Sequence, residues 1–202
     1  MTLIRALQKI RELGLPAFRT ADVAIHLGVS ASNASQILRQ LHQHDHVVPL
    51  KRGLWTWPNT HLMTLTNHLT APFPSYISLH TALYYHGMIS QIPDIIYCVS
   101  VARTRRYSTP LGTASIHHLP PELFFGYKLD SSETWAMATP EKALLDFLYL
   151  GSGKTRLFAA WPEIDLADSF SHRRFKTMVA KIPDPKRRSY VQRRADKLFG
   201  AA

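Results

Sequence analysis

The chain has 202 residues, of which 46% are hydrophobic, and it carries a formal net charge of +10 at neutral pH. This composition excludes an intrinsically disordered chain, and no apolar run reaches the length that crosses a bilayer. The excess of Lys and Arg favours an anionic partner, and the single cysteine, Cys98, favours a reducing, cytoplasmic location.

The positive charge is concentrated toward the two ends of the chain. Residues 1–58 hold seven Lys or Arg against three Asp or Glu, and residues 151–202 hold twelve against five, whereas residues 59–150 hold five against six. Basic surfaces of this kind favour nucleic acid or another acidic partner, and they predict binding that weakens as salt is added.

Residues 2–14 are predicted to form the first helix. Its apolar stripe consists of Leu3, Ile4, Leu7, Ile10 and Leu13, and Gly14 with Pro16 is expected to end it.

Residues 20–41 predict two helices joined by a tight turn. Thr20 is the expected N-cap of the first helix, and Gly28 is the expected left-handed residue at its end. Ser30 is expected to cap the second helix, whose apolar side chains recur at helical spacing at Ala34, Ile37, Leu38 and Leu41.

The other face of the second helix is rich in hydrogen-bonding groups and contains no acid. It carries Ser32, Asn33, Gln36, Arg39, Gln40 and Gln43, beside the capping residue Ser30. These residue types match the donor and acceptor patterns of base edges, so the helix is predicted to read the major groove of DNA. An ordinary helical pair with a polar outer face is the alternative.

A basic hairpin is predicted directly after this helix. Two short apolar strands, residues 47–50 and 54–58, flank the turn Lys51-Arg52-Gly53. Lys51 and Arg52 at the tip are expected to contact phosphates while the helix lies in the groove. Residues 1–58 together therefore predict a winged helix-turn-helix domain that binds double-stranded DNA.

The rest of the chain predicts an α+β fold, with residues 59–74 as a linker and residues 75–202 as a mixed α/β domain. Strands are expected at residues 95–101, 114–119, 122–127 and 135–138, and they would form a small sheet. Helices are expected at residues 79–86, capped by Ser78, and at residues 139–151, capped by Thr139 and packed on the sheet. Basic helices are expected to close the chain.

Two clusters of cations in this second part have two interpretations each. The turn at residues 103–107 carries Arg103, Arg105 and Arg106, and the last helix carries Lys186, Arg187, Arg188, Arg193, Arg194 and Lys197. Each is either a solvated segment or part of a second surface that binds nucleic acid.

The motifs that suggest catalysis or a cofactor are incomplete. The histidines at positions 42, 44 and 46 do not converge as a tetrahedral metal site requires, and Glu141 and Asp146 do not share a helix face. Residues 151–155 resemble a phosphate-binding loop, but they follow a helix and lack its first glycine. His80, Tyr84 and His86 have no acid or nucleophile at a motif spacing. We therefore predict no catalytic residues, no metal and no cofactor, and a protein that is not an enzyme.

Several motifs taken together resemble a known family. The helix pair with its hairpin Arg52-Gly53-Leu54-Trp55, the segment from Tyr76 to Gly87 and the segment from Ala138 to Asp146 resemble, in their order and spacing, the AbiE-type (AbiEi-like) antitoxins of type IV toxin–antitoxin systems.

The resemblance implies a repressor that binds inverted repeats in its own promoter, as a monomer or homodimer on DNA. It also implies a C-terminal antitoxin-type domain that counteracts a nucleotidyltransferase-like toxin without forming a stable complex with it. The alternative is a stand-alone winged-helix regulator, or a module that binds protein or RNA and has no toxin partner. No membrane partner is expected.

Overall fold

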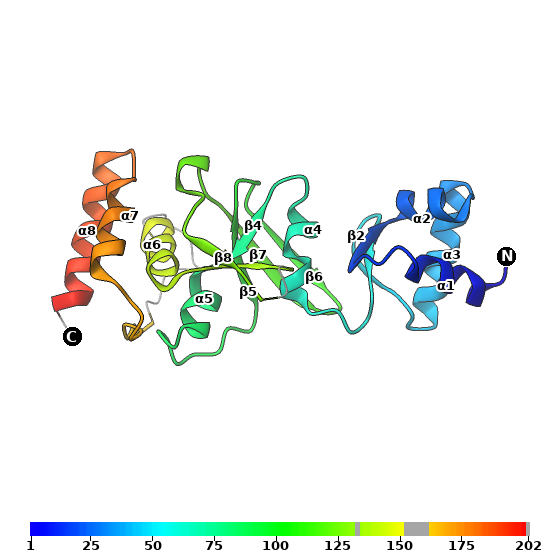
Figure 1. Cartoon of the computed structure of the whole chain (residues 1–202), viewed down its shortest axis with the longest axis horizontal. Helices are drawn as coiled ribbons and strands as arrows, with labels where there is room; N and C mark the ends of the chain where they lie inside the picture. Colours follow the sequence, from blue (N-terminus) through cyan, green and yellow to red (C-terminus); the bar gives the residue numbers. More distant parts are fainter. Residues whose placement is uncertain (132–133, 152–161, 201–202) are drawn as a thin grey trace.

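The structure is a computed structural model that describes residues 1–131, 134–151 and 162–200. It is an α+β molecule, elongated in Figure 1, with an N-terminal unit of helices and a small sheet at one end and the C-terminal helices at the other. Residues 152–155 of the phosphate-loop comparison lie outside the described residues. Within the described ranges, no helix is both long enough and apolar enough to cross a membrane.

The N-terminal unit combines three helices with a three-stranded antiparallel sheet of order β1-β3-β2. Its elements are α1 (Leu3–Arg11), β1 (Ala17–Arg19), α2 (Thr20–Leu27), α3 (Ala31–Gln43), β2 (Val48–Lys51) and β3 (Leu54–Thr56). Phe18 and Trp55 point from the sheet into the helix core, where they meet Ile10, Val23 and Leu38. The opposite face of the same sheet is buried against the next part of the chain.

Of the helix ends predicted for the helix pair of residues 20–41, two are confirmed and one is wrong. The hydroxyl of Ser30 accepts a hydrogen bond from the Asn33 N–H at 3.2 Å, and Gly28 ends α2 with a φ of 65°. Thr20, however, is the first helical residue and not the cap. Its hydroxyl accepts a hydrogen bond from the Trp55 indole N–H, and Asp22 accepts one from the Arg19 N–H instead.

The first helix differs from its predicted stripe at one position. Ala6 and Ile10 are its buried residues, whereas Ile4 is 72% exposed. Successive helical residues are rotated by about 100°, so the row through Leu3, Ala6 and Ile10 faces the core and Ile4 lies off that row.

Residues 59–74 connect the two parts and also pack between them. They contain the 3₁₀ helix η1 (Leu62–Leu65) and the short helix α4 (Thr66–Thr70). Leu62, Leu65 and Leu69 share one apolar cluster with Leu50 and Leu54 of the hairpin. Ala114, from the larger sheet, belongs to the same cluster, so a continuous core joins the two sheets.

The larger sheet has six strands in the order β6-β7-β5-β4-β9-β8. They are β4 (Ser75–Ile77), β5 (Ile96–Ser100), β6 (Arg105–Thr109), β7 (Gly112–His118), β8 (Tyr127–Leu129) and β9 (Ala136–Ala138). The β4–β9 and β5–β7 pairs are parallel and the other three pairs are antiparallel. The strands expected near residues 95–101, 114–119 and 135–138 are confirmed as β5, β7 and β9.

Two predictions in this region are wrong. The basic segment of residues 103–107 is not a turn, because Arg105, Arg106 and Tyr107 belong to the edge strand β6, which pairs with β7. The strand expected at residues 122–127 is instead the 3₁₀ helix η2 (Pro121–Leu123), and β8 begins only at Tyr127. Pro120 and Pro121 bring no N–H donors to a sheet, which favours the short helix.

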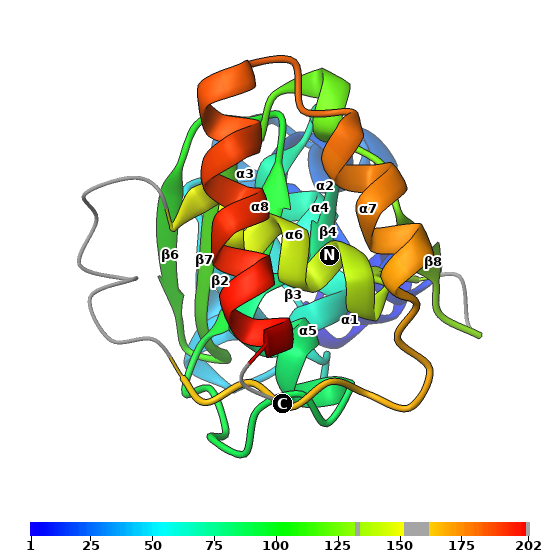
Figure 2. The same ribbon diagram turned by 90° about the vertical axis from the view of Figure 1, so that its left-hand side faces the viewer.

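Helix α6 (Pro140–Leu150) is the centre of the second core. It contacts α5 (Leu79–Tyr85) and β9 on one side, and α7 (His172–Ala180) and α8 (Pro185–Gly200) on the other. Figure 2 shows α7 and α8 lying across α6. The predicted packing of α6 on the sheet is confirmed, because α6 contacts β9 and the Tyr76 side chain of β4. The predicted single apolar side is wrong, because nine of its residues are buried and helices cover its other sides.

Candidate nucleic-acid interface

The outward face of α3 carries the residues that the sequence assigns to base contacts. Ala34, Leu38 and Leu41 are buried beneath it. Six polar side chains are exposed on it: Ser32, Asn33, Gln36, Arg39, Gln40 and Gln43. Within the described part of the chain, none of the six side chains forms a hydrogen bond or ion pair, so their donors and acceptors are open to a partner.

The hairpin of β2 and β3 is fixed to the start of α2. The Thr20 N–H donates to the carbonyl of Gly53 at 3.0 Å, and the Trp55 indole N–H donates to the Thr20 hydroxyl at 3.1 Å. Gly53 adopts a φ of 73°, a left-handed conformation that favours glycine at the tip. These contacts hold the hairpin at a set position relative to the helix pair.

The two cations of the hairpin have different environments. Arg52 is exposed at the tip and forms no ion pair or hydrogen bond with any other described residue. Lys51 is half-buried, because its ammonium donates to the Leu69 carbonyl at 2.7 Å and lies 5.7 Å from the ring centre of Tyr107. The tip therefore presents Arg52 to a partner, while Lys51 ties the hairpin to α4 and β6.

Lys51 also shows that cations from distant parts of the chain gather here. Burial lowers the pKa of Lys51, and the positive charges of Arg19 and Arg105 lower it further. The Arg105 guanidinium stacks over Tyr107, with 5.1 Å between its central carbon and the ring centre. Arg19 from β1, Lys51 from the hairpin and Arg105 from β6 thus form a basic patch, which we call the junction patch.

The other predicted cations lie elsewhere. Arg103 and Arg106 are exposed, and Arg106 alternates with Arg105 along β6, so its side chain leaves the opposite face of the strand. Burial raises the pKa of Tyr97 on β5, and the positive charge of Arg106 lowers it. The three arginines are therefore divided between two faces.

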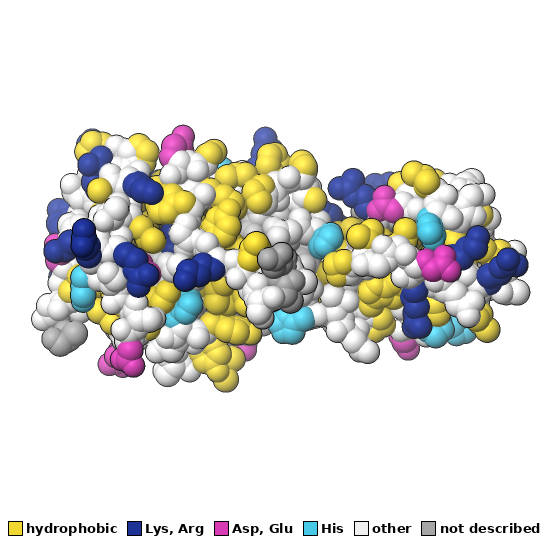
Figure 3. Space-filling model, viewed as in Figure 1, with side chains coloured by type: hydrophobic (Ala, Val, Ile, Leu, Met, Phe, Trp, Pro, Cys, Tyr) yellow, Lys and Arg dark blue, Asp and Glu magenta, His cyan; other side chains and the backbone are white. Residues whose placement is uncertain are grey.

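The cations of α8 lie at the far end of the molecule from α3. Figure 1 places α8 opposite the N-terminal unit, and Figure 3 shows Lys and Arg side chains over both ends of one face. Two of these cations support the fold: the Arg187 guanidinium stacks over Tyr149, and Arg188 donates to the Ile182 carbonyl at 2.9 Å. Four are exposed or face solvent: Lys186, Arg193, Arg194 and Lys197.

A buried polar cluster in the second core was not predicted. The Lys142 ammonium and the Asp146 carboxylate form an ion pair on one face of α6, and the hydroxyls of Tyr76 and Ser78 donate to Asp146 at 2.9 and 2.8 Å. Ser78 therefore binds Asp146 and does not cap α5 with its side chain. The feature of the sequence that indicates this ion pair is the i,i+4 spacing of Lys142 and Asp146.

Glu141 and Asp146 diverge, as their spacing predicted. Glu141 accepts a hydrogen bond from the Ser171 N–H and forms an ion pair with Arg174. These contacts are separate from the ion pair between Lys142 and Asp146. Among the described residues, no group of three or more His, Cys, Asp or Glu side chains converges as a metal site.

Comparison with models of protein families and with curated proteins finds no match for this chain. The features that bear on function are therefore the open polar face of α3 and the exposed hairpin cation Arg52.

Proposed function

We propose that the chain is a sequence-specific DNA-binding transcriptional regulator whose N-terminal unit acts as a winged helix-turn-helix. The observation that carries this proposal is the exposed face of α3, which holds six unengaged polar side chains and no acid, in the same N-terminal unit as the exposed hairpin cation Arg52. A helix with such a face can enter the major groove while a basic hairpin contacts the adjacent phosphates.

The junction patch extends the surface that would face the phosphates. Arg19 and Arg105 lie close enough to Lys51 for their charges to lower its pKa, so cations of both units are gathered beside the hairpin. Phosphate contacts supply affinity without reading sequence, whereas Arg39, Gln36 and Asn33 on α3 are the candidates for reading bases. Sequence recognition is thus assigned to α3, and sequence-independent affinity is assigned to the cations beside the hairpin.

The test is binding of the purified chain to its own upstream DNA and to a scrambled fragment of the same length, across a series of salt concentrations. A site-specific regulator is expected to prefer the upstream fragment by about a thousandfold or more. Equal, salt-sensitive binding to both fragments would reject sequence-specific regulation. A palindromic site would further indicate that two copies bind together.

We also propose that the regulator is the antitoxin of a type IV system that represses its own promoter and counteracts a nucleotidyltransferase-like toxin. The support is the resemblance of two segments, and the structure brings these same segments into contact. Tyr76 and Ser78 of the first donate hydrogen bonds to Asp146 of the second, so they build one core.

Co-expression with the product of a neighbouring nucleotidyltransferase-like gene tests the antitoxin role. Growth is expected to be restored by the chain, and also by an Arg39→Ala variant that no longer represses the promoter, with no stable complex between the two proteins. If growth is not restored while specific DNA binding persists, the chain is a stand-alone regulator.

A further inference from the structure

Helices α7 and α8 lie side by side at one end of the molecule, and this end is strongly basic (Figure 2). Residues 169–200 contain ten Lys or Arg and only two acids, Asp184 and Asp196. Asp184 accepts a hydrogen bond from the Lys186 N–H at 2.9 Å, and Asp196 accepts one from the Gln192 amide at 2.8 Å. Neither aspartate forms an ion pair with a described residue.

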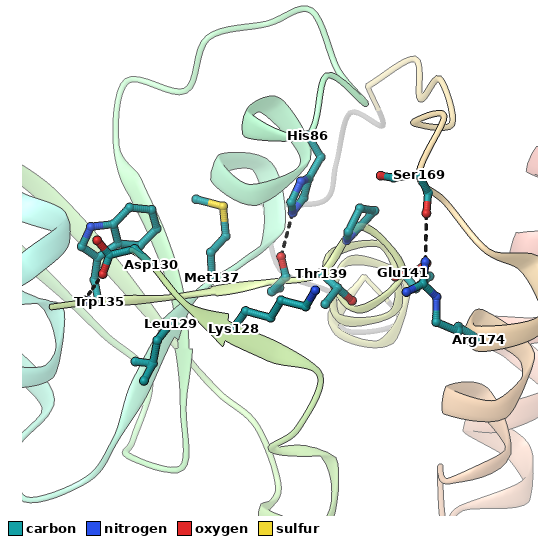
Figure 4. Close-up of a pocket in the computed structure, with 12 residues that line it drawn as sticks. His86, Lys128, Leu129, Asp130, Trp135, Met137, Thr139, Glu141, Ser169 and Arg174 are labelled. Carbon is teal, nitrogen blue, oxygen red and sulfur yellow. Dashed lines mark hydrogen bonds and ion pairs between the residues drawn. The ribbon is translucent and has the colours of Figure 1, made fainter. Parts of the chain in front are cut away.

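Most of these cations face solvent without a partner. Arg174 is engaged within the protein, because it pairs with Glu141 at 3.0 Å and donates to the Ser169 carbonyl at 3.0 Å (Figure 4). Five others are exposed, and their side chains form no ion pair or hydrogen bond with another described residue: Arg173, Lys176, Lys186, Arg193 and Lys197. We call them the five open cations.

Helix geometry places the five open cations in two rows. Lys186, Arg193 and Lys197 follow one another at intervals of seven and four residues, so they lie on one face of α8. Arg173 and Lys176 are three residues apart and share a face of α7. The opposite faces of both helices are buried in the second core, which fixes the two rows relative to each other.

A groove of about 380 Å³ runs between the two helices. Lys176 lines it from α7, and Arg193, Ser189 and Gln192 line it from α8. Ser189 is exposed, and its hydroxyl has no hydrogen-bond partner in the part of the chain that the structure describes. The groove thus offers a cation on each wall and an open hydroxyl.

The side chains of this end favour a phosphate backbone over a protein or a single strand. Among the described residues, no large hydrophobic side chain is exposed on α7 or α8, so a protein partner would find no apolar or aromatic anchor. Tyr190 is half-buried beneath the Arg194 guanidinium, so it offers no open ring on which unpaired bases could stack. Cations and a hydroxyl suffice to contact the backbone of a duplex.

The width of the paired helices favours an RNA duplex over DNA. Each helix with its side chains is about 10 Å across, so the pair presents a face about 20 Å wide, which cannot enter the DNA major groove of about 12 Å. The minor groove of an RNA duplex is wide and shallow, and it displays the 2′-hydroxyls. Two rows of cations on neighbouring helices can reach the phosphates on both sides of it.

We propose that the end of the molecule formed by α7 and α8 binds double-stranded RNA without reading its sequence. The five open cations contact phosphates, and Ser189 contacts a 2′-hydroxyl within the groove. This end lies opposite the N-terminal unit in Figure 1, so RNA binding here does not depend on whether α3 reads DNA.

The experiment measures binding of the full chain to a labelled RNA duplex of about 20 base pairs, whose sequence is unrelated to the upstream DNA. The comparisons are a DNA duplex of the same sequence and one RNA strand alone, all at about 0.1 M salt. We expect the RNA duplex to bind with a Kd about fivefold or more below that of either comparison. Arg39→Ala should bind the RNA duplex as the parent chain does.

The double variant Lys176→Gln with Arg193→Gln removes one exposed cation from each row. Its Kd for the RNA duplex should rise about tenfold, and the slope of log K against log salt should fall by about 1 to 2. Arg5→Gln with Arg103→Gln is the matched control, because it removes the same charge from two exposed positions outside α7 and α8. The control should bind as the parent chain does, and thermal unfolding verifies the fold of each variant.

The proposal is overturned if the RNA duplex does not bind saturably, or if the double variant binds it as tightly as the parent chain. Equal loss in the control would show that net charge alone attracts the RNA. Equal affinity for the RNA and DNA duplexes would reject a site for RNA. Loss of RNA binding in Arg39→Ala would place the RNA on α3 instead.

Discussion

The ammonium of Lys51 lies 2.7 Å from the carbonyl oxygen of Leu69, and this hydrogen bond fastens the hairpin of the N-terminal unit to α4 in the segment that connects the two units. The ring of Tyr107 on β6 covers the same ammonium. One of the two cations expected to contact phosphates is therefore engaged within the protein, whereas Arg52 is open to a partner. The position of the hairpin is coupled to the packing of the larger sheet.

We predict that Arg52→Met and Lys51→Met differ in their effect on DNA binding. Arg52→Met should reduce the slope of log K against log salt by about 0.9, the value for one phosphate contact, on upstream and scrambled DNA alike. Lys51→Met should change the slope less and lower the thermal midpoint more, because it removes the bond to Leu69. Binding isotherms in a salt series and thermal unfolding measure both effects. Identical changes in slope would show that Lys51 leaves Leu69 to contact DNA.

Arg39→Ala should weaken binding to the upstream fragment by about 1 to 3 kcal/mol, the usual contribution of a base contact by arginine. Binding to scrambled DNA should change far less, because base contacts are lost only at a specific site. Arg193→Ala on α8 is the control, since it removes the same charge from the far end of the molecule. A loss by Arg193→Ala that matches the loss by Arg39→Ala would assign α8 to the DNA interface.

Lys142→Met should lower the free energy of unfolding by about 3 to 5 kcal/mol, measured in urea, because it leaves the buried Asp146 carboxylate without its cation. Burial raises the pKa of Asp146 and Lys142 lowers it, so the variant should bind a proton at Asp146 more readily in the folded state than in the unfolded state. The difference in the free energy of unfolding between the parent chain and Lys142→Met should therefore grow as the pH rises from 4 to 7.

The double variant Lys142→Met with Asp146→Asn is the control for this ion pair. The asparagine oxygen can still accept from the Tyr76 and Ser78 hydroxyls, and no buried charge remains. It should recover a large part of the stability lost in Lys142→Met. A double variant that is less stable than Lys142→Met alone would show that packing, and not the unpaired charge, causes the loss.

His117 should make the fold sensitive to acid. Burial, with a contribution from the charge of His80, lowers the pKa of His117 to about 4. The folded state then resists protonation, so the stability contributed by neutral His117 is complete above pH 6.5 and is lost as the pH falls toward 4. The loss is of order 3 kcal/mol for a shift of this size.

The measurement is the free energy of unfolding against pH for the parent chain and for His117→Gln, whose amide can retain the hydrogen bond to Ser115. The curve of the variant should be flatter between pH 6.5 and 4. Parallel curves would mean that other groups, such as His80 and the carboxylates, cause the sensitivity to acid.

Local features of the fold were predictable from the sequence. The cap at Ser30, the left-handed turn at Gly28 and the cap at Thr139 depend on side chains within a few residues of each helix end. The exposed face of α3 follows from the spacing of Ala34, Leu38 and Leu41 alone. Helix ends and faces of this kind are decided by short-range geometry, which a single sequence contains.

The second core could not be predicted in the same way. Helix α6 reads as one apolar side with polar residues opposite, yet nine of its residues are buried because α5, α7 and α8 surround it. The edge strand β6 reads as a basic turn, because its pairing with β7 is set by the sheet and not by its own residues. Burial and pairing depend on partners far away in the chain.

The sequence by itself determined the helix pair, the basic hairpin, the positions of three of the strands and the list of side chains that face outward on α3. Only the tertiary structure decided that Lys51 bonds Leu69, that Arg105 and Arg19 gather beside Lys51 while the cations of α8 lie at the opposite end, and that Tyr76 and Ser78 bond Asp146. The physical reason is the separation along the chain of the residues that interact. Caps and amphipathic faces arise from neighbours along the chain, whereas each of these contacts joins elements that only packing brings together.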